Sequence, residues 1–89
     1  MLALGLGSSL ASAATITPTH DVHHITGNTT IDTINPPNPD FCGLLTLIFD
    51  NGPSISIGGN IARAFTALNG TIMMFVYDPN TQLWYPQYN

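Results

Sequence analysis

The chain has 89 residues, a formal net charge of −4 and a single basic residue, Arg63. Charged residues make up 7% of the sequence, against about 25% in an ordinary soluble domain. One cation cannot neutralise a run of phosphates, so the composition argues against nucleic-acid binding and against binding to an anionic membrane. The length allows one domain, which at this size is only marginally stable alone.

Threonine and asparagine take the place of the missing charged residues. The sequence has eleven Thr, eight Asn and five Ser, and it has no Lys and no Glu. Threonine is a strand former, and a neutral surface can be buried in a protein contact without leaving charges unpaired. We therefore expect an all-β subunit that contacts other proteins. The single cysteine, Cys42, allows neither an intrachain disulfide nor a cysteine-based metal site.

The first 14 residues carry leucine at alternate positions, the pattern of one side of an extended strand. They end in a small-residue box like that of a secretory signal, but they lack a positive charge and glycine dilutes the apolar stretch. We expect residues 1–14 to form an extended N-terminal arm that lies on a neighbouring subunit, ahead of a β domain over residues 15–89. The expected contact residues of the arm are Leu2, Leu4, Leu6 and Leu10.

Short strands separated by turn formers follow the arm, and no segment has a convincing helical pattern. A Gly27-Asn28 turn between two alternating segments predicts a β-hairpin. Three prolines between Asn35 and Asp40 predict a surface loop. The predicted strands are 14–17, 22–26, 29–34, 43–50, 54–57, 61–65, 71–78 and 83–85.

The predicted strand at residues 43–50, GLLTLIFD, is apolar on both of its faces. Residues 71–78, TIMMFVYD, repeat this design. We expect other residues to pack against both faces of each strand, and so short a chain can hardly supply enough of them by itself. The pattern favours a small β-sandwich or barrel-like domain that is a subunit of an assembly.

The segment from His20 to His24, HDVHH, is the one cluster with metal-ligand chemistry. In a strand, His23 and His24 point to opposite faces and cannot share an ion. We predict no metal site; His24 is the residue from which one could be built, by three copies around a trimer axis. We expect instead that His24 is packed or hydrogen-bonded, with His20 and His23 exposed.

Asp50 and Asp78 each stand at the exit of a predicted strand. No Glu, Lys or suitable base accompanies them, and Asp in this position usually caps the following turn. The scattered hydroxyls also lack the context that makes a nucleophile. We predict no catalytic residues, no enzymatic activity and no cofactor.

Aromatic residues gather near the end of the sequence. Such residues are enriched at interfaces, although a single Trp is as often part of a core. A surface aromatic patch for sugars or a protein partner is therefore a candidate site. Its members are Trp84, Tyr85 and Tyr88.

Several sequence boxes occur together in a characteristic order. They are ATITPT (14–19), HITG (24–27), GLLTLIFD (43–50), GGNI (58–61), AFT (64–66), VYD (76–78) and WY (84–85). In this order they resemble a small Thr-rich β domain that recurs, often C-terminally, in virion proteins of tailed bacteriophages. Those proteins include tail fibres, head fibres and capsid decoration proteins. The resemblance extends over residues 14–86.

The resemblance implies a non-enzymatic, trimeric module on the exterior of a virion. Fibre proteins are usually long, whereas this domain follows only a short arm, so we favour a capsid decoration (cement) protein that binds the major capsid protein and stabilises the shell. One alternative is a tail- or head-fibre tip that binds host surface glycans. Another is a secreted, extracellular β-protein that polymerises into filaments by donated-strand exchange.

Overall fold

The computed structural model describes residues 2–52, 54–55 and 59–87. The regular elements in these ranges are all β-strands, which confirms the all-β part of the predicted fold class. No helix in these ranges is long and apolar enough to cross a membrane. The strands are β1 (Ala3–Leu6), β2 (Leu10–Ala11), β3 (Thr15–Ile16), β4 (His20–Thr26), β5 (Thr33–Ile34), β6 (Gly43–Phe49), β7 (Ser54–Ile55), β8 (Phe65–Thr66), β9 (Thr71–Asp78) and β10 (Leu83–Pro86).

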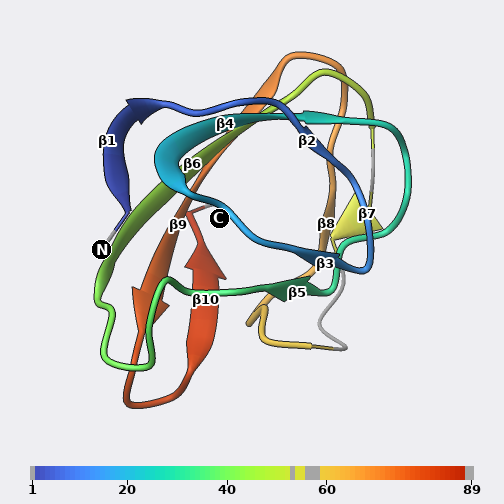
Figure 1. The fold of residues 1–89 in the computed structure, drawn as a ribbon. Helices are drawn as coiled ribbons and strands as arrows, with labels where there is room; N and C mark the ends of the chain where they lie inside the picture. Colours follow the sequence, from blue (N-terminus) through green and yellow to red (C-terminus); the bar gives the residue numbers. More distant parts are fainter. Residues whose placement is uncertain (1, 53, 56–58, 88–89) are drawn as a thin grey trace.

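The largest sheet has six strands and mixed pairing. Its order is β1-β4-β6-β9-β10, and β2 also pairs with β4. Strands β1, β2 and β6 run parallel to β4, whereas β9 is antiparallel to both β6 and β10. Figure 1 shows this sheet curving around the interior, with the two-stranded sheets β3–β5 and β7–β8 across from it. The large sheet is not closed into a barrel.

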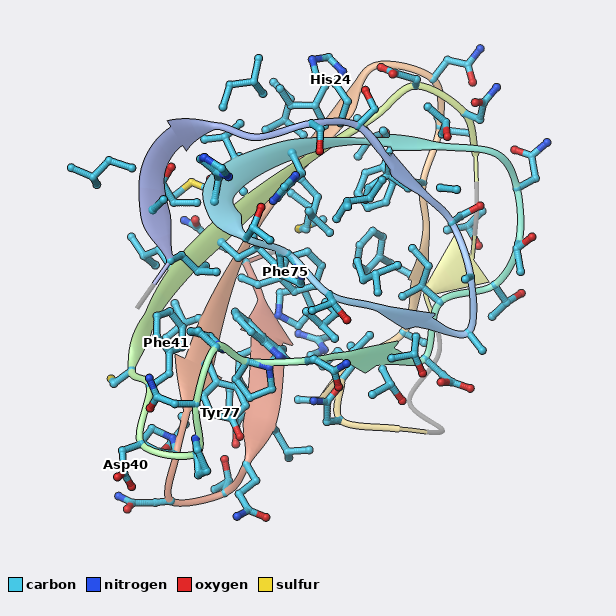
Figure 2. The ribbon with its side chains drawn as sticks, in the orientation of Figure 1. His24, Asp40, Phe41, Phe75 and Tyr77 are labelled. Atoms are coloured by element: carbon cyan, nitrogen blue, oxygen red, sulfur yellow. The ribbon has the colours of Figure 1, made fainter. Side chains whose placement is uncertain are left out.

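The core lies on the inner side of the large sheet. Alternate residues of β6 point inward and are completely buried, and Phe75 of β9 points into the middle of the molecule (Figure 2). The opposite side of the core is closed by apolar residues from the small sheets and the loops. The buried apolar residues are Leu2, Ile16, Ile25, Ile31, Ile34, Leu45, Leu47, Phe49, Ile61, Ala67, Phe75, Tyr77 and Trp84.

Trp84 connects the large sheet to the chain that crosses over the core. Its indole Nε1 donates a buried hydrogen bond of 2.8 Å to the carbonyl of Ile34. The same carbonyl accepts a bond of 2.7 Å from Asn60 Nδ2. The ring of Trp84 also packs against Tyr77, with centroids 5.0 Å apart, and against Phe41 at 6.0 Å. One side chain thus fixes both the aromatic core and the position of β5.

The predicted hairpin around Gly27-Asn28 is wrong. Strand β4 is flanked by β1, β2 and β6, while β5 pairs in parallel with β3 in another sheet. Gly27 does turn the chain, with a φ of 81°. However, its N–H donates to Asn51 Oδ1 at 2.9 Å, so the turn is fastened to the loop after β6. The chain then crosses the core, where Ile31 and Ile34 are buried.

The other predicted strands are found with different lengths. The two long apolar strands are confirmed as β6 and β9. The predicted strand at 61–65 is reduced to a single bridge at Ile61 and the two residues of β8. Of the predicted strand at 54–57, β7 covers the first two residues, and the remainder lies outside the described residues.

We predict that Trp84→Phe lowers the free energy of unfolding by about 2 kcal/mol, because it removes a buried hydrogen bond and leaves a cavity. The matched control is Tyr85→Phe on the opposite face, where the hydroxyl makes only an exposed 3.0 Å bond to Thr81 Oγ1. That change should stay within about 0.5 kcal/mol. Urea unfolding measures both, and equal losses would contradict the assigned role of Trp84.

Candidate interaction surface

The outer face of the large sheet, the side turned away from the core, is apolar and uncovered. Its large apolar side chains each expose between 39% and 63% of their area. These side chains come from β1, β6, β9 and β10, so the apolar surface extends across the sheet. They are Leu6, Leu44, Ile72, Met74, Val76 and Tyr85.

Strand register places these residues in three rows. Residues that pair across neighbouring strands point to the same side of a sheet, so each row is continuous. Half-buried residues of β4 and β6 fill the spaces between the exposed ones. The rows are Leu44–Val76–Tyr85, Leu6–Val22–Thr46–Met74 and His24–Ile48–Ile72.

Among the described residues, the three rows contain no Asp, Glu, Lys or Arg, and charged groups lie at the two ends of the face. At one end, His24 Nδ1 and Asp50 Oδ1 are 2.8 Å apart, and both side chains are partly exposed. At the other end, Asp78 Oδ1 accepts the N–H of Asn80 at 2.8 Å. The prediction that Asp78 caps its turn is confirmed, whereas Asp50 has His24 as its partner. An uncharged apolar centre with a polar rim is the usual anatomy of a protein interface.

His23, and not His24, is the buried histidine. The two side chains point to opposite faces of β4, as predicted, but the expectation that His23 is exposed is wrong. Figure 2 shows His24 at the outside of the sheet. No group of three His, Cys, Asp or Glu side chains that could hold a metal occurs among the described residues. His24 has Asp50 as a hydrogen-bond partner within its own chain.

The ring of His23 joins two segments of the backbone, the one at Ser8 and the one at Thr19 and His20. Its Nδ1 lies 2.7 Å from the carbonyl of Ser8, which can only accept, so Nδ1 carries the proton. Its Nε2 then accepts the backbone N–H groups of Thr19 and His20, each at 3.0 Å. The neutral imidazole is thus saturated with hydrogen bonds. It fastens the N-terminal segment to the start of β4, a structural role that sequence reasoning missed.

Gly7 leaves room for that ring. A Cβ atom built on Gly7 would collide with the His23 ring and would lie 2.8 Å from Nδ1 of His20. Because His23 is fixed by three hydrogen bonds, the ring cannot move aside. The close approach of the N-terminal segment to β4 therefore requires glycine at this position.

The N-terminal segment lies along β4 of its own chain. Leu2 is buried in the core, and Leu10 is half-buried against it. Leu4 and Leu6 are left exposed, by 86% and 62%. Of the four leucines predicted to bind a neighbour, the structure thus uses two internally and presents the other two to solvent.

The predicted surface aromatic patch is not formed as expected. Trp84 is completely buried, so it cannot belong to a surface patch. Adjacent residues of a strand point to opposite faces, and Tyr85 therefore lies on the outer face, partly exposed. Tyr88 lies outside the described residues.

A hollow of about 400 Å³ lies at the β1 side of the sheet. Asp21 is its only charged lining residue, and Asp21 Oδ1 accepts the N–H of Gly5 at 2.7 Å. Cys42, which is exposed, lines the same hollow. Leu44 lines the hollow and also belongs to the outer face, so the two are continuous. The lining residues are Leu2, Asp21, Phe41, Cys42, Gly43 and Leu44.

Comparison of the chain with models of protein families, with curated protein sequences and with solved structures gives no match. The assignment of a role to the outer face therefore rests on its own geometry and chemistry.

We predict that His23→Ala lowers the free energy of unfolding by about 3 kcal/mol, because three backbone groups lose a buried partner. His24→Ala, the matched control one residue away, should cost less than about 1 kcal/mol, as expected for a partly exposed ion pair. Chemical denaturation of the two variants tests this difference. A tolerated His23→Ala would show that the N-terminal segment does not depend on this ring.

Proposed function

We propose that this protein is a non-enzymatic structural subunit of a virion, specifically a capsid decoration protein that binds the exterior of a tailed-bacteriophage shell and stabilises it. The observation that carries the proposal is the exposure of large apolar side chains by a chain with very few charges. The side chains of this kind on or beside the large sheet are Leu4, Leu6, Leu44, Ile72, Met74, Val76 and Tyr85. Surfaces of this kind mark sites of protein interaction.

The sequence boxes supply the particular setting. They resemble a virion domain of tailed phages, which in this proposal acts as a homotrimer that contacts the major capsid protein. The hollow at the β1 side of the sheet is lined mainly by apolar groups and lacks a convergent set of polar residues, so it favours packing over chemistry. Binding alone is then the mechanism: apolar surface buried between neighbouring subunits stabilises the shell.

Strand β1 is the part of the chain best placed to reach a capsid. It lies at the edge of the large sheet, and Gly5 within it is held by Asp21. Leu4 next to this anchor is the most exposed of the large apolar side chains. A side chain presented from an ordered strand loses little conformational entropy on binding, which favours affinity.

The two alternative functions gain less support. The glycan-binding alternative expects Trp84 in an exposed aromatic surface, but that ring is buried. A donated-strand filament needs an unpaired strand, whereas β1 and β2 already pair with β4 of their own chain. Neither alternative has a feature of the structure that favours it over decoration.

We predict that Leu4→Asp weakens binding to phage capsids that lack this protein by about ten-fold or more, because a carboxylate would be buried in the contact. The matched control is Leu68→Asp, since Leu68 is also highly exposed, at 71%, but lies in the turn before β9. Co-sedimentation with capsids measures both variants. The proposal is wrong if the wild-type protein fails to bind capsids, and β1 is not the contact if Leu4→Asp binds as well as Leu68→Asp.

A further inference from the structure

The outer face of the large sheet is an apolar surface suited to binding a protein partner. It is formed by the central strand β6 and its neighbours, of which β6 and β9 are largely apolar on the core side and on the outer side alike. A strand of this kind is typical of sheets that are covered on both faces. Within the described residues no segment of the chain lies over the outer face, which keeps Leu44 and Ile72 more than half exposed.

We propose that the outer face is where copies of this chain bind one another. This inference deepens the proposed function, on which its biological setting rests, by naming the partner of this surface. In this proposal Leu4, at the edge of the sheet, contacts the capsid. Self-association and capsid binding therefore use different residues.

The area of the outer face suits a stable contact between subunits. Its six exposed apolar side chains present on the order of 500 Å², at the upper end of what a monomer usually shows. Half-buried Val22, Thr46 and Ile48 lie between them and would be covered by the same partner. Each partner of a standard interface buries about 800 Å².

The charge distribution also favours a second copy over a different protein. The three rows contain no aspartate and no arginine, and His24 at one end is already paired with Asp50. Such a face offers no charge that would select a basic or an acidic partner. Two copies can meet on it without placing like charges together at the centre, even though each carries a net charge of −4. Two further carboxylates stay at the rim: Asp78 caps its own turn, and Asp21, in the adjoining hollow, accepts the N–H of Gly5.

The first test is the mass of the wild-type protein in solution, measured by sedimentation and light scattering over a wide range of concentration. A species with two or three times the mass of the chain supports the proposal. Ile72→Asp should then raise the dissociation constant by about thirty-fold or more. Leu68→Asp, the matched control outside the face, should leave it unchanged. A monomeric wild type, or an Ile72→Asp variant that assembles like wild type, overturns the proposal.

A second measurement covers the case in which Ile72→Asp does not fold. In a Cys42→Ser background, Thr46→Cys places one thiol near the centre of the outer face, and Leu68→Cys places it in the turn before β9. A short bis-maleimide should join copies of the Thr46→Cys variant and leave the Leu68→Cys variant unlinked. Equal cross-linking of the two variants overturns the proposal.

The outcomes for assembly and for capsid binding are independent. Wild-type protein that stays monomeric but binds capsids would disprove the self-contact and leave the decoration role intact. Protein that assembles through the outer face but does not bind capsids would do the reverse.

Discussion

The two-sided apolarity of β6 is the constraint on which the rest of the structure depends. One side is satisfied inside the chain, where Leu45, Leu47 and Phe49 are completely buried. To cover that side, the chain runs from β4 across the core through β5 and returns in β6. Within the described residues no segment lies over the other side. The uncovered face is thus the result of a small chain that completes one core only.

The polar interior contacts are few, and they act at the points where the chain changes direction. His23 holds the N-terminal segment against the start of β4, and the Trp84 indole holds β5 over the core. The His23 ring satisfies three backbone groups, and the Trp84 indole gives the carbonyl of Ile34 a second donor beside Asn60. No buried side-chain nitrogen or oxygen among the described residues lacks a hydrogen bond. Histidine and tryptophan here support the backbone, in a chain that has few charged residues to stabilise its turns.

Much of the fold could be predicted from local pattern. The apolar runs identified β6 and β9, and the turn chemistry identified Asp78 as a cap. The pairing of β4 could not be predicted, because a local Gly-Asn turn signal competes with the burial of Ile31 and Ile34 in a distant part of the core. For the site, the two apolar faces of β6 were visible in the sequence. The sequence did not show which of Trp84 and Tyr85 lies in the core, because alternation places them on opposite faces of β10 without indicating which face is buried.

The parallel pairing of β4 with β6 also has a consequence for how the protein folds. Val22 of β4 pairs with Thr46 of β6, and Leu47 of β6 pairs with Met73 of β9. These central strands can therefore pair only after the long chain segments between them have closed into loops. Closing such loops costs entropy before any contact compensates for it, and topologies of this type fold slowly. Until these strands pair, β6 and β9 each expose two apolar faces and can associate with other unfolded chains. Dilution, or synthesis at a low rate, should therefore raise the yield of correctly folded chains, since unproductive association depends on concentration more steeply than folding does.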